Sequence, residues 1–433
     1  MSDLLIPVIT RPFTSAITPP GSKSLTNRAM VLAALAAGPC TLRNVLFADD
    51  TEVMIDCLVR LGFAVTVDRA THTVSVAGQG GRIPAEAAEL YCGNSGTTIR
   101  FVSAMVSVGR GRYLLDGNPR MRQRPIRGLI DILKNLGVRV AYPIAEGFPP
   151  VEIIAESLPG GLLTYGSEQS SQYLSAVLMA APYARFETHV DLIGQQTSWP
   201  YVAMTLQLMD VFGHTPELER DDWGNPKQII IPQGQYAPTD YNVEPDASNA
   251  SYFLAAAAIH PGATVTIQGL GASSLQGDIG FAHVLEGMGA FLIFAKDSIE
   301  ITGMDELKGI EVDLLSMPDM AQTLAVVSLF AKGQTIIRGL HTLKVKETDR
   351  IQALATELRK LGAEIDAGED YLAITPPDKI TPAEIDTYDD HRMAMSFAIA
   401  GTRAQGVLIK DIECTNKTYP NYFADLAKVV SPV

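Results

Sequence analysis

The sequence is poor in the features that mark extracellular, membrane and nucleic-acid-binding proteins. It has only four cysteines in 433 residues, and none lies in a CxxC or metal-ligand spacing, which disfavours a disulfide framework or a zinc site. Its longest apolar runs reach about ten residues, well short of the roughly 20 that a membrane-spanning helix needs. Basic residues number 34 against 48 acidic ones, a net charge of −14, so a generic nucleic-acid-binding surface is not indicated.

Common nucleotide and metal motifs are missing as well. The stretch Gly21-Ser22-Lys23-Ser24 lacks the spacing of a Walker loop, no GxGxxG opens a helix after a strand, and no HExxH is present. We therefore expect neither a bound metal nor a dinucleotide. The first residues contain no basic segment followed by a sustained apolar run, so we expect no signal peptide and a cytoplasmic protein.

What the sequence does contain is one α/β unit repeated six times. Each copy has a polar turn, a short Ala/Leu-rich helix, a β-branched strand and a longer helix that closes on a glycine. The copies open at Gly21, Gly93, Glu168, Glu244, Met317 and Tyr388. The closing glycines stand at 62, 137, 213, 289 and 362, which gives spacings of 75, 76, 76 and 73 residues. Because this period exceeds the roughly 20 to 50 residues of common solenoid repeats, it indicates a domain of three units used twice.

The two kinds of helix predict where each lies. The short ones, such as residues 251–258, are apolar on all sides and must be buried all round, whereas the longer ones, such as 351–361, have one apolar stripe. We therefore predict an α/β fold of two similar domains, each with three βαβαββ units, parallel helices inside and strands outside. The Pro-bearing stretch 235–240 places the boundary between domains 21–239 and 1–20 plus 240–433. Residues 6–9 are predicted to form a strand that completes the C-terminal half.

The starts of the short helices collect anion-binding chemistry in an otherwise acidic chain. A helix N-terminus offers free N–H groups and a partial positive charge, so six starts that point the same way favour phosphates and carboxylates. The candidates at these starts are Lys23, Arg28, Asn94, Gly96, Thr97, Arg100, Ser170, Ser171, Gln172, Asp246, Asp319, Asp389, His391 and Arg392. Basic clusters at 119–125 and 344–350, together with Lys417, add further cations.

Two carboxylates stand among these cations and suit proton transfer. Asp319 opens the fifth short helix, and Glu347 lies in the second basic cluster. Carboxylates close to many cations can exchange protons with a bound anion. A simple helix cap is the alternative for Asp319, and spacing alone leaves it open.

Seven motifs in order resemble the 3-phosphoshikimate 1-carboxyvinyltransferases, also called 5-enolpyruvylshikimate-3-phosphate synthases, of the enolpyruvyl transferase family. The motifs are Pro20-Gly21-Ser22-Lys23-Ser24 to Arg28, Gly93-Asn94-Ser95-Gly96-Thr97 to Arg100, Pro119-Arg120-Met121 to Arg124-Pro125, Ser170-Ser171-Gln172, Val345-Lys346-Glu347-Thr348-Asp349-Arg350, Asp390-His391-Arg392-Met393-Ala394 and Lys417-Thr418. The resemblance covers about Pro20 to Phe423.

The resemblance implies an inside-out α/β barrel in each domain, with the active site in the cleft between the two domains. It implies transfer of the enolpyruvyl group of phosphoenolpyruvate to the 5-hydroxyl of shikimate 3-phosphate, with release of phosphate. The reaction would pass through a tetrahedral intermediate without a metal or organic cofactor. We expect a monomer with small-molecule substrates and no nucleic-acid or membrane partner.

The same resemblance assigns residues to each substrate. Shikimate 3-phosphate would be bound by Lys23, Ser24, Arg28, Ser170, Ser171, Gln172, Ser198, Tyr201, Asp319 and Lys346. Phosphoenolpyruvate would be bound by Lys23, Gly96, Arg124, Gln172, Arg350, Arg392 and Lys417. Asp319 would accept the 5-hydroxyl proton, Glu347 would protonate the methylene carbon, and Lys23 could assist either transfer.

Two positions depart from the family pattern. Thr342 replaces an Asn that usually contacts the shikimate phosphate, which puts that contact in doubt. Thr98 replaces a small Ala near the phosphoenolpyruvate pocket, and we expect it to change sensitivity to the inhibitor glyphosate, which a comparison with Thr98→Ala would test.

Three other functions compete with this interpretation. The sister enzyme that transfers enolpyruvate to UDP-N-acetylglucosamine has Lys-Asn where this chain has Lys23-Ser24, and it usually carries a catalytic Cys in the loop that here spans 119–124. An RNA-end-processing cyclase of similar units would fit poorly with the acidic charge. A non-catalytic anion-binding protein would have no need of Asp319 and Glu347.

Overall fold

The computed structural model describes residues 2–166 and 170–431, so Glu168, where the third copy was expected to open, lies outside the described residues. The chain divides into two compact units: the first unit is Gly21–Val243, and the second unit is Met1–Pro20 with Glu244–Val433. The boundary between the two domains was predicted to lie after Thr239. However, β14 (Asp240–Asn242) pairs in parallel with β3 (Pro39–Arg43) and therefore belongs to the first unit. No helix in the described part of the chain is both long and apolar enough to span a membrane.

Three four-stranded sheets with one repeated strand order build the first unit. In each sheet the first pair of strands is parallel and the next two pairs are antiparallel. The orders are β14-β3-β5-β4, β6-β7-β9-β8 and β10-β11-β13-β12. The remaining strands are β4 (Val65–Asp68), β5 (Thr73–Ala77), β6 (Ala87–Tyr91), β7 (Gly111–Asp116), β8 (Arg139–Ala141), β9 (Val151–Ala155), β10 (Gly161–Gly166), β11 (Thr188–Ile193), β12 (Glu217–Arg220) and β13 (Pro226–Ile231).

The second unit repeats this plan in the sheets β16-β17-β15-β2 and β19-β21-β23-β22, while its third sheet, β1-β25-β24, has three strands. A two-stranded sheet joins β18 and β20. The bounds are β1 (Leu4–Leu5), β2 (Thr14–Ile17), β15 (Thr264–Gln268), β16 (Phe291–Phe294), β17 (Ser298–Thr302), β18 (Leu307–Lys308), β19 (Glu311–Asp313), β20 (Ala331–Lys332), β21 (Thr335–Arg338), β22 (Glu364–Ala367), β23 (Tyr371–Thr375), β24 (Ala383–Ile385) and β25 (Val407–Ile409).

The N-terminal segment completes two sheets of the second unit rather than one. Strand β1 pairs with β25, and β2 pairs in parallel with β15. The expectation of a strand at 6–9 was wrong in position, because Pro7 has no N–H to donate to a strand ladder. Isolated bonds hold the stretch instead: Ile6 N donates to Val407 O, and Ile9 N donates to Thr402 O.

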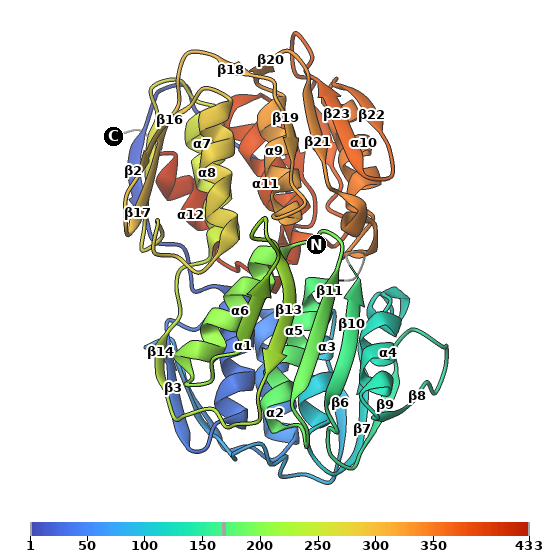
Figure 1. Ribbon diagram of the computed structural model, residues 1–433. Helices are drawn as coiled ribbons and strands as arrows, with labels where there is room; N and C mark the ends of the chain where they lie inside the picture. Colours follow the sequence, from blue (N-terminus) through green and yellow to red (C-terminus); the bar gives the residue numbers. More distant parts are fainter. Residues whose placement is uncertain (1, 167–169, 432–433) are drawn as a thin grey trace. The chain divides into compact units, whose positions relative to one another are not determined.

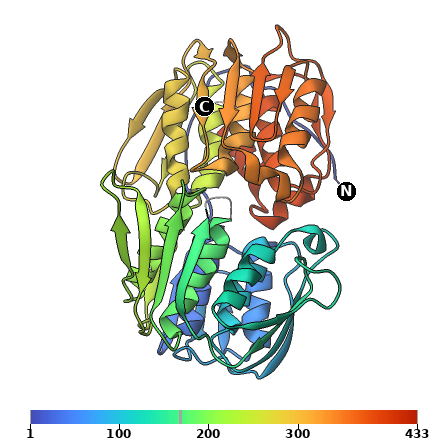
Figure 2. The same cartoon turned by 45° about the vertical axis from the view of Figure 1, so that its right-hand side comes forward.

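Apolar helices form the interior of each unit, as the sequence predicted, although they are not shorter than the others. Figures 1 and 2 show helices enclosed by strands within each unit. The inner helices are α1 (Lys23–Leu35), α3 (Gly96–Val106), α5 (Ser171–Ala180), α7 (Ala247–Ala258), α9 (Ala321–Ser328) and α11 (His391–Arg403), whose described residues are almost all buried. Their small side chains let helices and sheets approach closely, so each unit has its own apolar core.

The other six described helices lie nearer the surface, and their glycine ends explain the 75-residue period. They are α2 (Asp49–Arg60), α4 (Arg127–Asn135), α6 (Trp199–Val211), α8 (Phe281–Gly287), α10 (Arg350–Lys360) and α12 (Tyr422–Val429). They were expected to be the longer ones, but the longest has 13 residues, as do α1 and α11, and α8 has only 7. Each of the first five is followed two residues later by a predicted closing glycine, at 62, 137, 213, 289 and 362, with φ between 80° and 113°. Glycine adopts this left-handed conformation at little cost, which is why a helix that must end there uses it.

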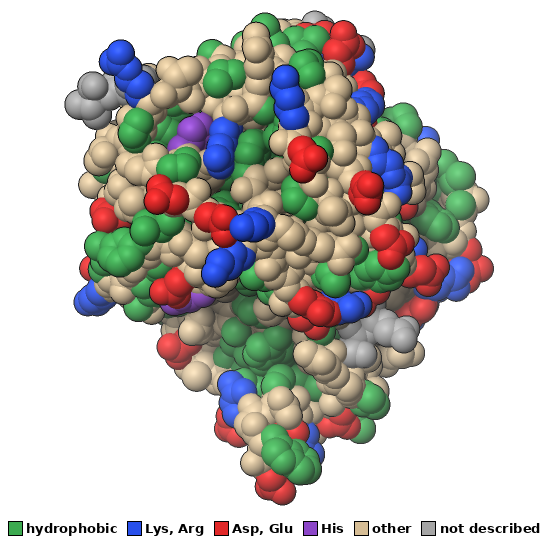
Figure 3. All heavy atoms as spheres, turned by 90° about the horizontal axis from the view of Figure 1, so that it is seen from above, with side chains coloured by type: hydrophobic (Ala, Val, Ile, Leu, Met, Phe, Trp, Pro, Cys, Tyr) green, Lys and Arg blue, Asp and Glu red, His purple; other side chains and the backbone are tan. Residues whose placement is uncertain are grey.

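Charges of both signs are mixed on the surface. On the face that Figure 3 shows, Lys and Arg side chains are interspersed with Asp and Glu side chains, and the described residues on this face form no continuous basic patch. Such a surface agrees with the net charge of −14, and the concentrated cations have to be sought at the helix starts.

Candidate active site

The three inner helices of the first unit all begin on a serine. The hydroxyl oxygens of Ser22, Ser95 and Ser170 accept from the N–H groups of Leu25, Thr98 and Gln172 at 3.4, 3.3 and 3.4 Å. A serine cap satisfies one of the free N–H groups without adding negative charge. The positive ends of α1, α3 and α5 therefore remain attractive to anions.

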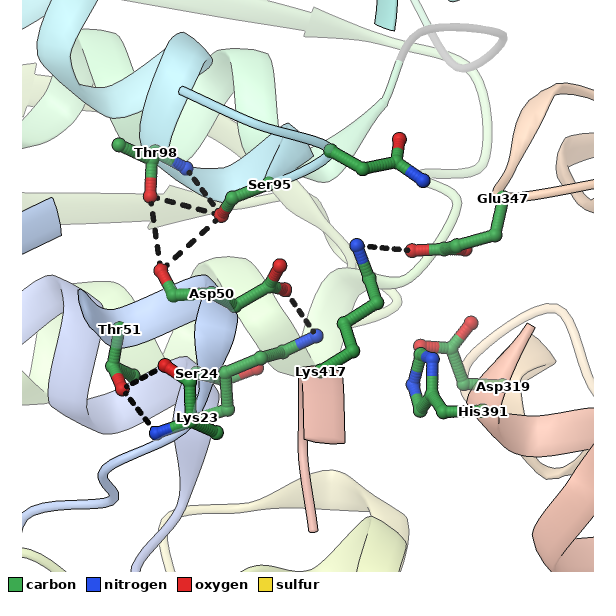
Figure 4. Close-up of polar contacts among 12 residues, drawn as sticks. Lys23, Ser24, Asp50, Thr51, Ser95, Thr98, Asp319, Glu347, His391 and Lys417 are labelled. Atoms are coloured by element: carbon green, nitrogen blue, oxygen red, sulfur yellow. Dashed lines mark hydrogen bonds and ion pairs between the residues drawn. The ribbon is translucent and has the colours of Figure 1, made fainter. Parts of the chain in front are cut away.

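Lys23 is the first residue of α1 and forms a largely buried ion pair. Its Nζ lies 3.2 Å from Oδ2 of Asp50, and the two side chains are 15% and 4% exposed. Figure 4 shows this pair beside the first turn of α2, which carries Asp50. Asp50 was not a predicted site residue, because an acidic residue in the first turn of a helix has an ordinary structural explanation.

Gly96, the first residue of α3, makes room for two arginines. A Cβ at this position would lie 2.6 Å from Nη2 of Arg124 and 3.1 Å from Nη1 of Arg100. Arg124 is 4% exposed, and its Nη1 donates to the carbonyl oxygen of Asn94 at 2.9 Å. Its buried Nε has no hydrogen-bond partner among the described residues, so the guanidinium has one N–H that is not used within them.

The start of α5 joins this cluster through Gln172. Its Oε1 accepts from Nη1 of Arg100, whose guanidinium lies over the ring of Tyr173 at 5.2 Å. Ser170 and Ser171 form the cap and first residue of the same helix. Ser198 caps α6 in a left-handed conformation, φ 53°.

Arg28 is a buried cation whose recorded partners are all neutral. It is 1% exposed, and it donates to Thr205 Oγ1 at 2.7 Å, Ser24 O at 3.0 Å, Ser175 Oγ at 3.2 Å and Tyr201 O at 3.3 Å. Burial lowers its pKa to about 10. The guanidinium thus fastens α1 to α5 and α6, and a buried positive charge with neutral neighbours favours an anion nearby.

In the second unit, Asp319 lies at the centre of a network of three cations. It belongs to the 3-10 helix η4 (Pro318–Met320) that precedes α9. Its carboxylate lies 3.1 Å from Arg350 Nη1, 3.1 Å from Arg392 Nη2 and 3.4 Å from Lys346 Nζ. Burial by itself would raise the pKa of Asp319, but Lys346, Arg392 and Arg350 outweigh it and hold the pKa well below its ordinary range. Asp319 is therefore ionised in the ligand-free protein.

Arg350 links Asp319 to two further carboxylates. Its side chain is 2% exposed, with Nε 2.7 Å from Asp390 Oδ2 and Nη2 2.8 Å from Glu347 Oε2. Burial would lower the pKa of Arg350, but these carboxylates raise it above its ordinary value. Oε1 of Glu347 also lies 3.7 Å from Nζ of Lys417, which is the last residue of the 3-10 helix η6 (Ile412–Lys417).

The structure therefore joins the six residues of the second unit that were assigned to a substrate or to proton transfer into one connected set. These residues are Asp319, Lys346, Glu347, Arg350, Arg392 and Lys417. The sequence analysis did not include Tyr252, whose hydroxyl accepts from Arg392 Nη1 at 3.4 Å and whose pKa is raised to about 12 by burial. Thr342, one of the two departures from the family pattern, lies in the 3-10 helix η5 (His341–Val345). Its buried hydroxyl has no hydrogen-bond partner within residues 2–166 and 170–431.

The chemistry of the two sets is complementary. The first unit offers helix N-termini and cations, and the second offers carboxylates within reach of cations, as phosphate binding with proton transfer requires. Within the described residues, no group of three or more His, Cys, Asp or Glu side chains is arranged to hold a metal ion.

Comparison with known proteins gives one consistent result. Residues 8–426 match the family model described as EPSP synthase (3-phosphoshikimate 1-carboxyvinyltransferase). A 3-phosphoshikimate 1-carboxyvinyltransferase from Trichormus variabilis is 43% identical over 99% of this chain and 100% of its own length. A chloroplastic relative of the same name from Nicotiana tabacum is 47% identical over 93% of this chain and 80% of its own. The solved EPSP synthase of Acinetobacter baumannii superposes with a TM-score of 0.80 at 28% identity, covering 98% and 97% of the two chains.

Proposed function

This chain belongs to the EPSP synthase family, and from that premise we propose which of its side chains bind the substrates and which move protons. Its activity is 3-phosphoshikimate 1-carboxyvinyl transfer, a step of the shikimate pathway that leads to aromatic amino acids. Phosphoenolpyruvate gives its enolpyruvyl group to the 5-hydroxyl of shikimate 3-phosphate, and phosphate is released. Transfer to UDP-N-acetylglucosamine, the alternative, has no support among these matches.

We propose that shikimate 3-phosphate is bound by side chains of both units. The proposed ligands are Lys23, Ser24, Arg28, Ser170, Ser171, Gln172, Ser198, Tyr201, Asp319 and Lys346. Support comes from the serine-capped starts of α1 and α5, which leave positive helix ends for a phosphate. Arg28 would act mainly by positioning α1, α5 and α6, since its recorded hydrogen bonds already go to Thr205, Ser175 and two carbonyls.

For phosphoenolpyruvate we propose Lys23, Gly96, Arg124, Gln172, Arg350, Arg392 and Lys417. The support is the close approach of arginines to Gly96, where any side chain would occupy the place of an oxyanion. The nitrogens that face this place are Nη2 of Arg124 and Nη1 of Arg100. Arginine forks suit both the carboxylate and the phosphate of this substrate.

Two protons must move in the addition step. Glu347 would protonate the methylene carbon of phosphoenolpyruvate while the 5-oxygen attacks its C2, and Asp319 would accept the proton of the 5-hydroxyl. Elimination then breaks the C–O bond to phosphate and removes a proton from the new methyl group, which restores the enolpyruvyl double bond. Lys23 could assist either transfer by stabilising the charges that develop.

The ion pairs of Asp319 are the main support for its proposed role as the base. With three cations close by, the lowered pKa makes free Asp319 a weak base. Anionic substrates that share Lys346, Arg350 and Arg392 would draw these cations away and raise the pKa of Asp319. The base would then become effective only when its substrates are bound, which limits unproductive proton exchange.

The direct test mixes the purified chain with shikimate 3-phosphate and phosphoenolpyruvate and measures phosphate. We expect release that needs both substrates. Absence of release, or release only with UDP-N-acetylglucosamine as acceptor, would contradict the proposal.

We further propose that the chain works as a monomer, because one chain supplies every ligand named above. Sedimentation velocity at assay concentrations would test this, and an active species found only as a dimer would contradict it. The expected cytoplasmic location stays a prediction.

A further inference from the structure

Thr98, which departs from the family pattern, contacts a neighbouring helix through its hydroxyl. Thr98 Oγ1 donates to the backbone carbonyl of Asp50 at 3.2 Å and lies 2.9 Å from Ser95 Oγ. Ser95 Oγ lies 3.4 Å from the same carbonyl and accepts from Thr98 N at 3.3 Å. Both side chains are buried, at 0% and 1% exposure. Figure 4 shows the two hydroxyls converging on Asp50.

These bonds act on the first turn of α2. One proton arrangement satisfies the pair, with Ser95 donating to Thr98 and Thr98 donating to the carbonyl. The opposite side of this turn is fixed by Thr51, whose Oγ1 accepts from Ala48 N at 3.0 Å and donates to Leu46 O at 2.8 Å. The turn is therefore held by its own loop on one side and by α3 on the other.

Asp50 connects this turn to Lys23. Its backbone carbonyl receives the hydroxyl bond, and its carboxylate pairs with Lys23 Nζ at 3.2 Å. A long lysine side chain is flexible, so the position of its ammonium depends on that carboxylate. Because Asp50 is 4% exposed, little solvent is available to replace a displaced pair.

We propose that the Ser95–Thr98 hydroxyl pair is a positioning element for Lys23: it fixes the first turn of α2, and so the carboxylate of Asp50 that orients the Lys23 ammonium toward phosphoenolpyruvate. This inference deepens the proposed function and depends on the role given there to Lys23. Ser95 and Thr98 act through Asp50, and the proposal requires no contact of their side chains with substrate.

Thr98→Val tests the proposal, because it removes the hydroxyl and keeps the side-chain volume. We expect kcat/KM for phosphoenolpyruvate to fall roughly threefold to tenfold, the scale of one buried hydrogen bond. Thr98→Ser keeps the hydroxyl and should stay within about twofold of the wild type. In an Asp50→Asn background, Thr98→Val should have little further effect, because the carboxylate that it positions is gone.

Ser103→Ala is the matched control. Ser103 is also a buried hydroxyl of α3, but it donates to Ile99 O within the same helix at 2.7 Å. It should change thermal stability as Thr98→Val does and leave kcat/KM unchanged. Normal turnover by Thr98→Val, or an undiminished loss in the Asp50→Asn background, would overturn the inference.

The inference and the proposed function fail in different ways. If Lys23→Met keeps full activity, the role of Lys23 fails and this inference fails with it. If Lys23→Met is inactive while Thr98→Val matches the wild type, the proposed function stands and only the positioning role is overturned.

Discussion

The inner helices of the two units begin with different chemistry, although two sheets of the second unit repeat the strand order found in the first unit. In the first unit the described caps of α1, α3 and α5 are serines. In the second unit Asp246 and Asp390 cap α7 and α11, whereas α9 begins after Met320, and Asp319 lies in the preceding 3-10 helix η4 without capping α9. A serine leaves the partial positive charge of the helix end in place, whereas an aspartate neutralises it and can bind a cation.

This difference separates two tasks within one repeated fold. Neutral caps keep the first unit attractive to phosphates and carboxylates. In the second unit the acidic cap Asp390 holds Arg350, and Asp319, in the 3-10 helix before α9, holds Arg392. We infer that the first unit contributes mainly anion binding, whereas the second unit combines anion binding with proton transfer by Asp319 and Glu347.

Lys23→Met should have the largest effect, because it removes a full charge from the anion-binding side. We expect kcat/KM to fall at least about a hundredfold, about 3 kcal/mol of transition-state stabilisation. The side chain is placed for charge rather than packing, so unfolding should remain cooperative. The control is Lys227→Met, which replaces an exposed lysine of β13 and should retain activity. Equal turnover of both variants would leave Lys23 as a structural ion-pair partner of Asp50 with no role in binding substrate.

Asp319→Asn tests the proton-transfer side. The change keeps the shape of the side chain but removes the base, so kcat should fall by about a thousandfold. Asp378→Asn, at an exposed position of the same unit, should leave kcat unchanged. A variant whose KM rises while kcat stays constant would make Asp319 a binding residue and would break the comparison.

The same variant should alter stability in a pH-dependent way. Three cations lose a shared partner, so we expect about 2 kcal/mol of destabilisation at neutral pH. The folded-state pKa of Asp319 is lowered, so its contribution is present above the unfolded value of about 3.9 and is lost as pH falls toward the folded value. Urea midpoints of the variant and wild type should therefore differ most near pH 7 and converge below about pH 4. A constant difference would argue against the ion pairs.

Exchanging a cap tests the comparison most directly. Ser170→Asp gives α5 the acidic cap of the second unit, and Ser170→Asn provides a neutral cap of the same size. Both variants lose the serine hydroxyl, so the ratio of their KM values measures the effect of the added charge alone. We expect KM for shikimate 3-phosphate to be about tenfold higher for Asp than for Asn, from charge repulsion at partly screened distances. Equal KM values would mean that the neutral cap has no role in anion binding.

The sequence predicted the features that depend on local patterns. The closing glycines mark left-handed residues after helices, and the apolar helices 251–258 and their equivalents are buried as their composition required. Pro7 shows the limit of this reasoning, because an apolar β-branched run around it was expected to form one continuous strand.

Features that depend on packing between distant segments were not predictable. Asp50 has the sequence pattern of a helix start, and only the packing of α2 against α1 makes it the partner of Lys23. Arg28 has the sequence pattern of a ligand-binding cation, yet it is fastened to Thr205, 177 residues away. The network around Arg350 likewise joins Asp319 and Asp390, which lie in different repeats.

Tyr388→Phe should have the smallest effect. It tests how the turn before α11 in the second unit differs from the turn before α3 in the first unit. The turn before α3 obtains its left-handed residue from Gly93, φ 55°, whereas the turn before α11 uses Tyr388 and Asp389, φ 56° and 53°. Side chains rarely adopt this conformation without support, and Tyr388 is supported by a 2.6 Å bond from its hydroxyl to buried Glu357 Oε1. Glu357 keeps Lys360 as a partner after the substitution, so we expect only about 1 kcal/mol of destabilisation.

The urea midpoint of unfolding would measure this loss. Tyr371→Phe is the control: it removes a surface hydroxyl that is bonded to Asp366 and should leave the midpoint unchanged. Equal midpoints for both variants would mean that the backbone before α11 is held by the Arg350–Asp390 pair without help from Tyr388.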